Sequence, residues 1–106
     1  MNLGLEGKVA VITGGSDGIG KAAALSMSRE GARVAIAARD QSRLDAAVAD
    51  ISDQTQNPVL GISTDVRDED SVRSLISQVV DQWGGIDILV NNAGTSSTSR
   101  FEDMSN

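Results

Sequence analysis

An apolar run, a glycine-rich turn and a helix-forming stretch follow one another without a break over residues 8–31. The apolar run, residues 9–12, is typical of a parallel strand that is covered on both faces. Strong helix formers come after the three glycines of the turn, which are Gly14, Gly18 and Gly20. Glycine lets the backbone approach an anion closely, and the start of a helix offers unpaired N–H groups and the positive end of the helix dipole. The segment therefore predicts a phosphate site, with a plain structural turn as the alternative.

The same alternation of strand and helix patterns continues along the chain. It predicts strands at residues 8–13, 33–38, 59–63 and 86–90, and helices at about residues 19–30, after Asp40 or Ser42, and from Asp68 to Trp83. Alternating strands and helices form a parallel sheet with right-handed crossovers. The predicted fold class is α/β, a truncated Rossmann-type (doubly wound) parallel sheet with strand order 3-2-1-4. Its first two helices would cover one face and its third the other.

The spacing of small and apolar residues predicts which side of each helix faces the sheet. In the first helix, the small residues Ala22, Ala23 and Ser26 are expected to face inward. In the second, the inward positions are Leu44, Ala47, Val48 and Ile51. In the third, apolar residues recur over three turns and are expected to be core: Val72, Leu75, Ile76, Val79, Val80 and Trp83.

Two short motifs lie where predicted strands end. Residues 13–20 read Thr-Gly-x-x-x-Gly-Ile-Gly after the first strand, and residues 91–94 read Asn-Asn-Ala-Gly after the fourth. The glycine spacing differs from the Gly-x-Gly-x-x-Gly of the commonest dinucleotide fingerprint. In its motifs and in their spacing the chain instead resembles the short-chain dehydrogenase/reductase family, over nearly its whole length. Ligands of such sheets lie at the carboxyl ends of the strands, beside the switch point, where both motifs fall.

The resemblance implies that the glycine turn binds part of a dinucleotide cofactor. The residues that would line the pyrophosphate and the adenosine ribose are Gly14, Ser16, Asp17, Gly18, Ile19 and Gly20.

The resemblance also assigns roles to residues that follow the third and fourth strands. Asp65 and Val66 would hold the adenine, and the residues beside the ribose would be Asn92, Ala93 and Gly94. In the family, residues matching Thr13 and Asn91 mainly brace the central strands. Taken alone, Asp65 could equally be a turn former, and Asn91-Asn92 could be a solvated strand end.

Two residues at the end of the second strand bear on which dinucleotide binds. An NAD site places a carboxylate about 20 residues past the glycines, where it holds the ribose 2′-hydroxyl. Ala38 stands at this position and Arg39 follows it, and an arginine can pair with a 2′-phosphate through charge-assisted hydrogen bonds. NADP is therefore the predicted cofactor, ahead of NAD. The acids Asp17 and Asp40 weaken this preference, and a surface salt bridge is the alternative role for Arg39.

Composition argues against several function classes. The 15 acidic and 9 basic residues give a net charge of -6, which disfavours a broad nucleic-acid surface. No apolar run is long enough to cross a membrane and no signal-peptide pattern begins the chain, so a cytoplasmic location and no membrane partner are expected. The sequence has no cysteine and no histidine, so no disulfide and no metal site are predicted.

The catalytic residues that the resemblance implies are absent from these 106 residues. Family members transfer a proton with a Tyr-x-x-x-Lys pair and a serine, but this sequence has no tyrosine. Its only lysines, Lys8 and Lys21, flank the first strand and the first helix. No catalytic residue is therefore predicted, because histidine and cysteine are missing as well.

These observations lead to one main hypothesis about function. We expect residues 1–94 to be a partial NAD(P)-binding domain and residues 95–106 to be a polar tail that starts a missing second half. The chain would then be an N-terminal fragment of an NADP-dependent oxidoreductase that moves a hydride between cofactor and a carbonyl or alcohol, and it would be inactive alone. The candidates include 3-oxoacyl-carrier-protein reductases and sugar or alcohol dehydrogenases, and a small-molecule substrate would bind only in the full-length form.

A second hypothesis comes from a different class. The fourth strand would have one unpaired edge, which invites pairing with another chain. The protein could therefore be a non-catalytic nucleotide-binding or interaction module that recruits a partner through this edge. The resemblance also implies that the third helix contributes to subunit contacts in a homo-oligomer.

Overall fold

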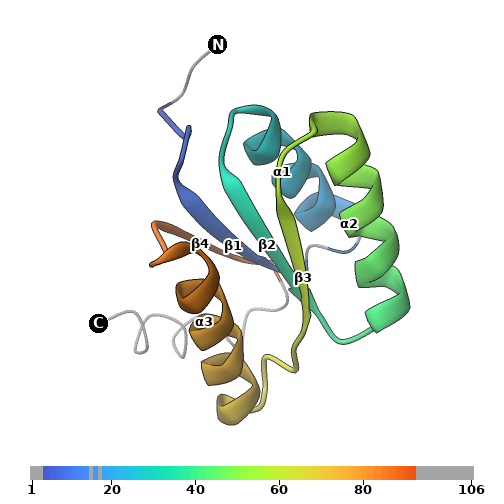
Figure 1. The fold of residues 1–106 in the computed structure, drawn as a ribbon. Helices are drawn as coiled ribbons and strands as arrows, with labels where there is room; N and C mark the ends of the chain where they lie inside the picture. The colour runs from blue at the N-terminus through green and yellow to red at the C-terminus, as the bar shows by residue number, and fades with distance from the viewer. Residues whose placement is uncertain (1–3, 15, 17, 93–106) are drawn as a thin grey trace.

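A four-stranded parallel sheet forms the centre of the molecule (Figure 1). The computed structural model describes residues 4–14, 16 and 18–92. Its elements are β1 (Val9–Thr13), α1 (Gly18–Arg29), β2 (Arg33–Ala38), α2 (Gln41–Thr55), β3 (Val59–Ser63), α3 (Glu69–Trp83) and β4 (Ile88–Asn91). Neighbouring strands are parallel, and their order is β3-β2-β1-β4. The predicted α/β class and strand order are confirmed.

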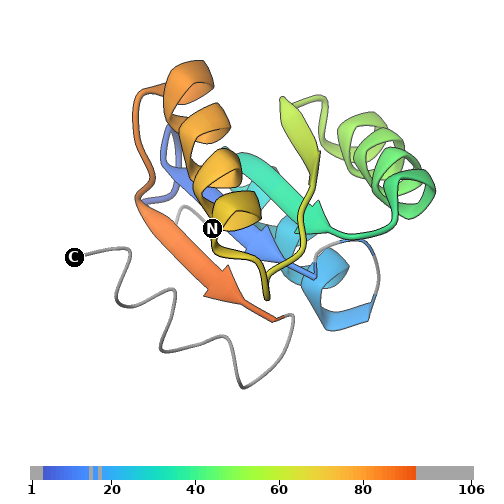
Figure 2. The same cartoon turned by 90° about the horizontal axis from the view of Figure 1, so that it is seen from below.

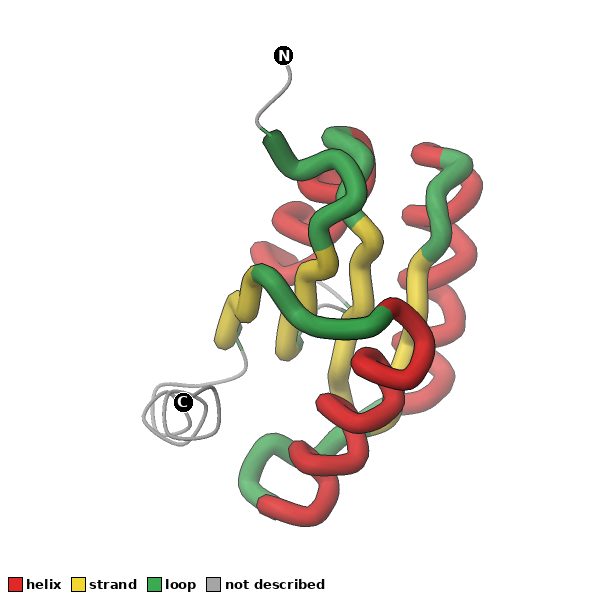
Figure 3. Tube along the Cα trace, turned by 60° about the vertical axis from the view of Figure 1, so that its left-hand side comes forward, coloured by secondary structure: helices red, strands yellow, loops and turns green. Residues whose placement is uncertain are grey.

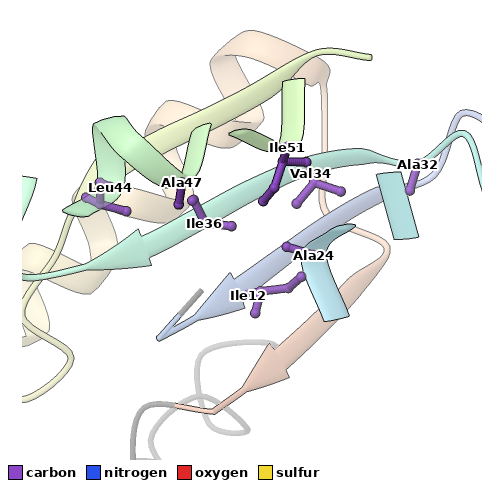
Figure 4. Packing of buried hydrophobic residues seen from close by; sticks show 8 residues of the cluster. All are labelled: Ile12, Ala24, Ala32, Val34, Ile36, Leu44, Ala47 and Ile51. Carbon is purple, nitrogen blue, oxygen red and sulfur yellow. The ribbon is translucent and has the colours of Figure 1, made fainter. Parts of the chain in front are cut away.

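The helices divide between the two faces of the sheet as predicted. Figures 2 and 3 show α1 and α2 on one face and α3 on the other. Because side chains alternate along a strand, the strands supply two separate cores. On the α1–α2 side, Ile12, Val34 and Ile36 are fully buried against the two helices (Figure 4). On the α3 side, Val11 and Ala35 are buried against that helix.

The inward face of α1 differs from the prediction. The buried residues are Gly20, Ala24 and Ser28, four residues apart. Of the predicted residues, Ala23 is half-buried and packs against the core, whereas Ala22 and Ser26 are exposed. Three consecutive alanines offer no apolar periodicity from which a face could be read. The side of α1 that faces the sheet is set instead by Gly20, which must lie against the turn that precedes the helix.

The predicted stripe on α3 is correct at its centre and wrong at one margin. Val72, Leu75 and Val79 are buried, but Val80 is 40% exposed. An apolar stripe that covers more than one side of a helix cannot be buried completely by one sheet face.

The described helices include none that is both long enough and apolar enough to cross a membrane.

Acidic side chains begin the second and third helices. Asp40 Oδ1 accepts a hydrogen bond from the Arg43 backbone N–H at 3.2 Å, and Asp68 Oδ1 accepts one from the Asp70 N–H at 3.0 Å. Such caps satisfy N–H groups that have no partner within the helix. Asp40 is therefore the cap of α2, and the alternative Ser42 lies inside the helix.

The fourth strand begins later than predicted, at Ile88. Just before it, the Asp87 carboxylate accepts a hydrogen bond from the Val9 N–H at 2.9 Å, while the Asp87 N–H donates to the Val9 carbonyl at 2.9 Å. A side chain thus takes the place of a backbone acceptor at the start of the β1–β4 pair. A side-chain acceptor at this position leaves no periodic pattern in the sequence, so the later start of the strand could not be predicted.

Buried polar groups join the ends of α1 and α2. The Ser28 hydroxyl lies 2.7 Å from the Thr55 hydroxyl, and the Asn57 side-chain amide donates to the Ser28 carbonyl at 2.7 Å. At the other end of α1, the Lys21 ammonium lies 2.5 Å from the Asp50 carboxylate on α2. These contacts fix α1, and therefore the turn before it, relative to α2.

Gly61 in β3 lets α2 lie close to the sheet. A Cβ atom at this position would lie 2.7 Å from Val48 Cγ2. We expect Gly61→Ala to lower the free energy of unfolding, measured by chemical denaturation, by about 1–3 kcal/mol. The β-branched side chain of Val48 has few rotamers and cannot easily move away from the added methyl group.

Gly85→Ala is the matched control for this substitution. A Cβ at Gly85 would meet nothing within 4 Å, and Gly85 has no positive φ. The control shares the loss of unfolded-state entropy and should be neutral or slightly stabilising. Adding Val48→Ala to Gly61→Ala should recover part of the loss. Equal stability of the two glycine variants would contradict this account of the packing.

Candidate functional site

The carboxyl ends of all four strands meet at one edge of the sheet. Thr13 is in register with both Ala37 of β2 and Asn91 of β4, and Ala38 is in register with Ser63 of β3. The segments that follow these strands carry most of the residues singled out from the sequence. Three of them, Asp17, Ala93 and Gly94, lie outside the described residues.

The turn after β1 depends on glycine at several positions. Gly14 and Gly18 have φ values of 71° and 59°, which favour glycine because other residues carry a Cβ. A Cβ on Gly20 would collide with the Gly14 carbonyl oxygen and lie 2.9 Å from Asn92 Nδ2. The turn is therefore drawn tightly against the start of α1 and against the end of β4.

The start of α1 is suited to an anion. The helix begins at Gly18 and its first four residues include no acid. Ser16 in the turn is half-buried, while Ile19 is 80% exposed. Unpaired N–H groups and the helix dipole at such a start favour a negatively charged ligand. Asp17, which directly precedes the helix in the sequence, lies outside the described residues.

The Thr13 hydroxyl braces β1 against β4. Thr13 is fully buried, and its Oγ1 donates to Asn91 Oδ1 at 3.0 Å and accepts from the Asn92 backbone N–H at 3.0 Å. This is the bracing role that the resemblance implies for Thr13 and Asn91. The bond to Asn92 also fixes where the chain leaves the sheet, beside Gly20.

Asp65 lies just past β3 and is held by Arg67. Its Oδ1 accepts from the Arg67 backbone N–H at 3.0 Å and from Arg67 Nε at 3.2 Å. These hydrogen bonds, first the one from the backbone, lower the pKa of the Asp65 carboxyl below its usual value, and the charges of Arg67 and Arg39 add to this effect. Asp65 is thus a turn former, as the alternative interpretation held, but it uses only one carboxylate oxygen for this. Val66 beside it is half-buried.

Arg39 follows β2 and is exposed. Its backbone carbonyl accepts a hydrogen bond from the Ser63 hydroxyl at 3.1 Å. The described part of the chain provides no ion pair to its guanidinium, since Asp40 lies 3.8 Å from Arg43 Nε and Asp65 is paired with Arg67. The salt bridge considered as an alternative role for Arg39 is therefore not formed within these residues.

Sequence reasoning missed Arg67 and Arg43 at this edge of the sheet. Each stands a few residues after an aspartate, in the orders Asp65-Val-Arg67 and Asp40-Gln-Ser-Arg43. An aspartate beside a strand end with an arginine two or three residues later is the signal that could have indicated these pairs.

Comparison with known proteins decides the family. A family model described as short chain dehydrogenase matches residues 8–106. The chain belongs to the short-chain dehydrogenase/reductase family.

Individual family members match over most of this chain. It is 38% identical to an uncharacterized oxidoreductase of Staphylococcus epidermidis over 91% of its length, and 41% identical to mouse 3-ketodihydrosphingosine reductase over 96%. The structure of L-sorbose reductase from Gluconobacter frateurii, solved with NADPH and L-sorbose, matches 90% of the chain with a TM-score of 0.86 and 43% identity. The chain covers 40%, 32% and 36% of these three proteins respectively.

Removing the Thr13 hydroxyl should weaken the brace between β1 and β4. We expect Thr13→Val to lower the free energy of unfolding by about 1–3 kcal/mol, because the Asn92 backbone N–H and the Asn91 side-chain oxygen Oδ1 lose the Thr13 hydroxyl as a partner. Chemical denaturation measures this loss. Thr64→Val is the control, since Thr64 is also buried but its hydroxyl bonds only to the Ile62 carbonyl, two residues away. A larger loss in the control would show that the brace is unimportant.

The pairing of Asp65 with Arg67 predicts a pH effect of definite sign. Because the folded-state pKa of Asp65 is lowered, the pair stabilises the fold above the unfolded value of about 3.9 and this contribution is lost as pH falls through the folded-state pKa. We expect Arg67→Ala to raise the Asp65 pKa toward its ordinary value, measured by NMR titration of the carboxyl carbon. Arg73→Ala, on α3, should leave it unchanged. Identical titration of Asp65 in both variants would rule out the pairing.

Proposed function

We propose that this chain is the cofactor-binding part of an NADP-dependent oxidoreductase that transfers a hydride between NADP(H) and a carbonyl or alcohol substrate. The observation that carries the proposal is the arrangement at the carboxyl edge of the sheet. There the glycine turn, Arg39, Asp65 and Asn92 come from four different strands to one place. In doubly wound sheets this edge is where dinucleotides bind.

In this proposal the turn before α1 holds the diphosphate. The backbone around Ser16 and Ile19 would donate hydrogen bonds, assisted by the helix dipole. The close contact between Gly20 and Gly14 keeps this backbone beside β1. Asp17, the remaining member of the predicted turn site, would lie with these residues near the adenosine ribose.

The adenosine end would lie across the ends of β2 and β3. Arg39 would pair with the 2′-phosphate, because its guanidinium has no ion pair within the described residues. Ala38 leaves no carboxylate to hold a free 2′-hydroxyl, which disfavours NAD. Asp65 would accept a hydrogen bond from the adenine amine, and the Val66 backbone would meet the ring. The NADPH in the L-sorbose reductase structure supports this choice of cofactor.

The ribose next to the nicotinamide would lie at the end of β4. Asn92 is exposed there and is positioned by its backbone bond to the Thr13 hydroxyl. Ala93 and Gly94 follow it in the motif and would line the same ribose. Residues 1–94 would thus form the partial dinucleotide-binding domain, and residues 95–106 would begin the part that binds substrate.

The residues of this chain bind and orient, and they do not transfer the substrate proton. The bound dinucleotide would supply or accept the hydride. A carbonyl oxygen that receives the hydride also needs a proton, and the usual donors, tyrosine, histidine and cysteine, do not occur in the sequence. We expect the 106-residue chain alone to bind cofactor without turnover.

The proposal extends to the chemical class of the substrate. A 3-oxoacyl group on a carrier protein remains a candidate, and the names of the relatives add a ketose, L-sorbose, and a long-chain ketone, 3-ketodihydrosphingosine. All three are ketones, so reduction of a ketone by NADPH is the reaction that they share.

Titration of the purified chain with NADPH and NADH tests the proposal. We expect binding of both and tighter binding of NADPH. Arg39→Ala should weaken NADPH binding by about tenfold to a hundredfold, the range for losing a charge-assisted hydrogen bond, and should change NADH binding little. The matched control is Arg73→Ala, which removes the same charge from an exposed pair with Glu69 on α3. A well-folded chain that binds neither dinucleotide would refute the proposed function.

A further inference from the structure

After β2 and β3 the chain places three arginines close to acidic residues, and Asp40 and Asp65 form ion pairs there. Each carboxylate has its own arginine: Asp40 lies 3.8 Å from Arg43 Nε, and Asp65 lies 3.2 Å from Arg67 Nε. Arg39 is left over, with no ion pair among the described residues. Arg39 is therefore the arginine of this group whose guanidinium is left for the 2′-phosphate in the proposed function.

We propose that Arg67 is a specificity-determining residue that acts through Asp65: by holding the Asp65 carboxylate, it keeps Arg39 available to the 2′-phosphate of the cofactor. This inference rests on the proposed function and extends it to a residue that does not touch the phosphate. Arg67 is in this sense a positioning residue.

The backbone geometry makes Asp65 the natural competitor for Arg39. Ala38 and Ser63 are paired in the sheet, and Thr64, the residue after β3, donates its N–H to the Ala38 carbonyl at 2.8 Å. Arg39 and Asp65 are thus each one residue beyond a hydrogen-bonded pair. The charge of Arg39 also makes a small contribution to lowering the pKa of Asp65, after the larger effects of Arg67.

Arg67 limits this competition with two donors on one oxygen. Its backbone N–H and its Nε both bond to Asp65 Oδ1, and Asp65 Oδ2 accepts no hydrogen bond from the described residues. A carboxylate that is already paired with one guanidinium attracts a second one less strongly. Asp65 Oδ2 remains available for the adenine amine, whose recognition is common to NADPH and NADH.

Asp40 is not an equivalent competitor. Its Oδ1 is occupied as the cap of α2, and Arg43 lies beside its Oδ2. Asp40 also stays in place when Arg67 is changed, because its partners belong to α2. A change in cofactor preference on loss of Arg67 would therefore arise at Asp65.

The test is the ratio of dissociation constants for NADH and NADPH, because contacts shared by the two dinucleotides cancel in it. We expect Arg67→Ala to reduce this preference for NADPH by about two- to fivefold, the range for exposed ion pairs. Arg67→Lys, which keeps a charge, should recover part of the preference. Arg73→Ala controls for the loss of one positive charge, and circular dichroism confirms that each variant is folded.

A double-mutant cycle with Asp65→Asn separates capture of Arg39 from a direct effect of the Arg67 charge on the phosphate. If Asp65 is the intermediary, Arg67→Ala should leave the ratio unchanged in the Asp65→Asn background. An equal reduction in both backgrounds would overturn the proposal, as would an unchanged ratio in Arg67→Ala alone, while the proposed function would stand. Binding of neither dinucleotide to the wild-type chain would overturn both.

Discussion

The close approach of Gly20 to the Gly14 carbonyl places the start of α1 directly against the end of β1. This contact sets the phase of the helix, because Ala24 and Ser28 follow Gly20 at intervals of four residues and become its buried face. Ser28 in turn lies against Thr55 at the end of α2. A side chain at Gly20 would push α1 away from the turn after β1 and from α2. The anion-binding backbone and the packing of one sheet face thus depend on the same missing Cβ.

The charge of the molecule and the chemistry of its candidate site point in opposite directions. A net charge of -6 disfavours any polyanionic ligand at long range. The turn avoids this problem because its donors are backbone N–H groups, whose effect is local and independent of side-chain charge. Only the adenosine end needs a cation, and there the pairing of Asp40 and Asp65 with their own arginines leaves Arg39. In the proposed function, Arg39 would therefore be the cation that meets the dinucleotide, in spite of the negative net charge.

The topology of the sheet could be predicted from the sequence, but several individual side-chain contacts could not. Apolar runs, glycine turns and the α3 stripe predicted the strand order and the sides on which the helices pack, because each follows from periodicity. The burial of Ser28 in place of Ser26 could not be predicted, since it depends on the tertiary contact of Gly20. The Arg67–Asp65 pair was likewise missed, because an exposed ion pair leaves no periodic trace. Residues of the site were recognised where a motif demanded them, as with Thr13 and Asn91, whose hydrogen bond the structure contains.

In the proposed function, cofactor binding and cofactor discrimination would rest on different kinds of interaction. The turn after β1 is held by buried groups, among them the Thr13 hydroxyl and Gly20, whose contacts are little affected by ionic strength. In the proposed function, cofactor discrimination would rest on the charges of Arg39, Asp65 and Arg67 near the surface, which salt screens over about 8–10 Å at physiological ionic strength. Substitutions near the exposed charges can therefore alter which dinucleotide is preferred without disturbing the fold that holds it.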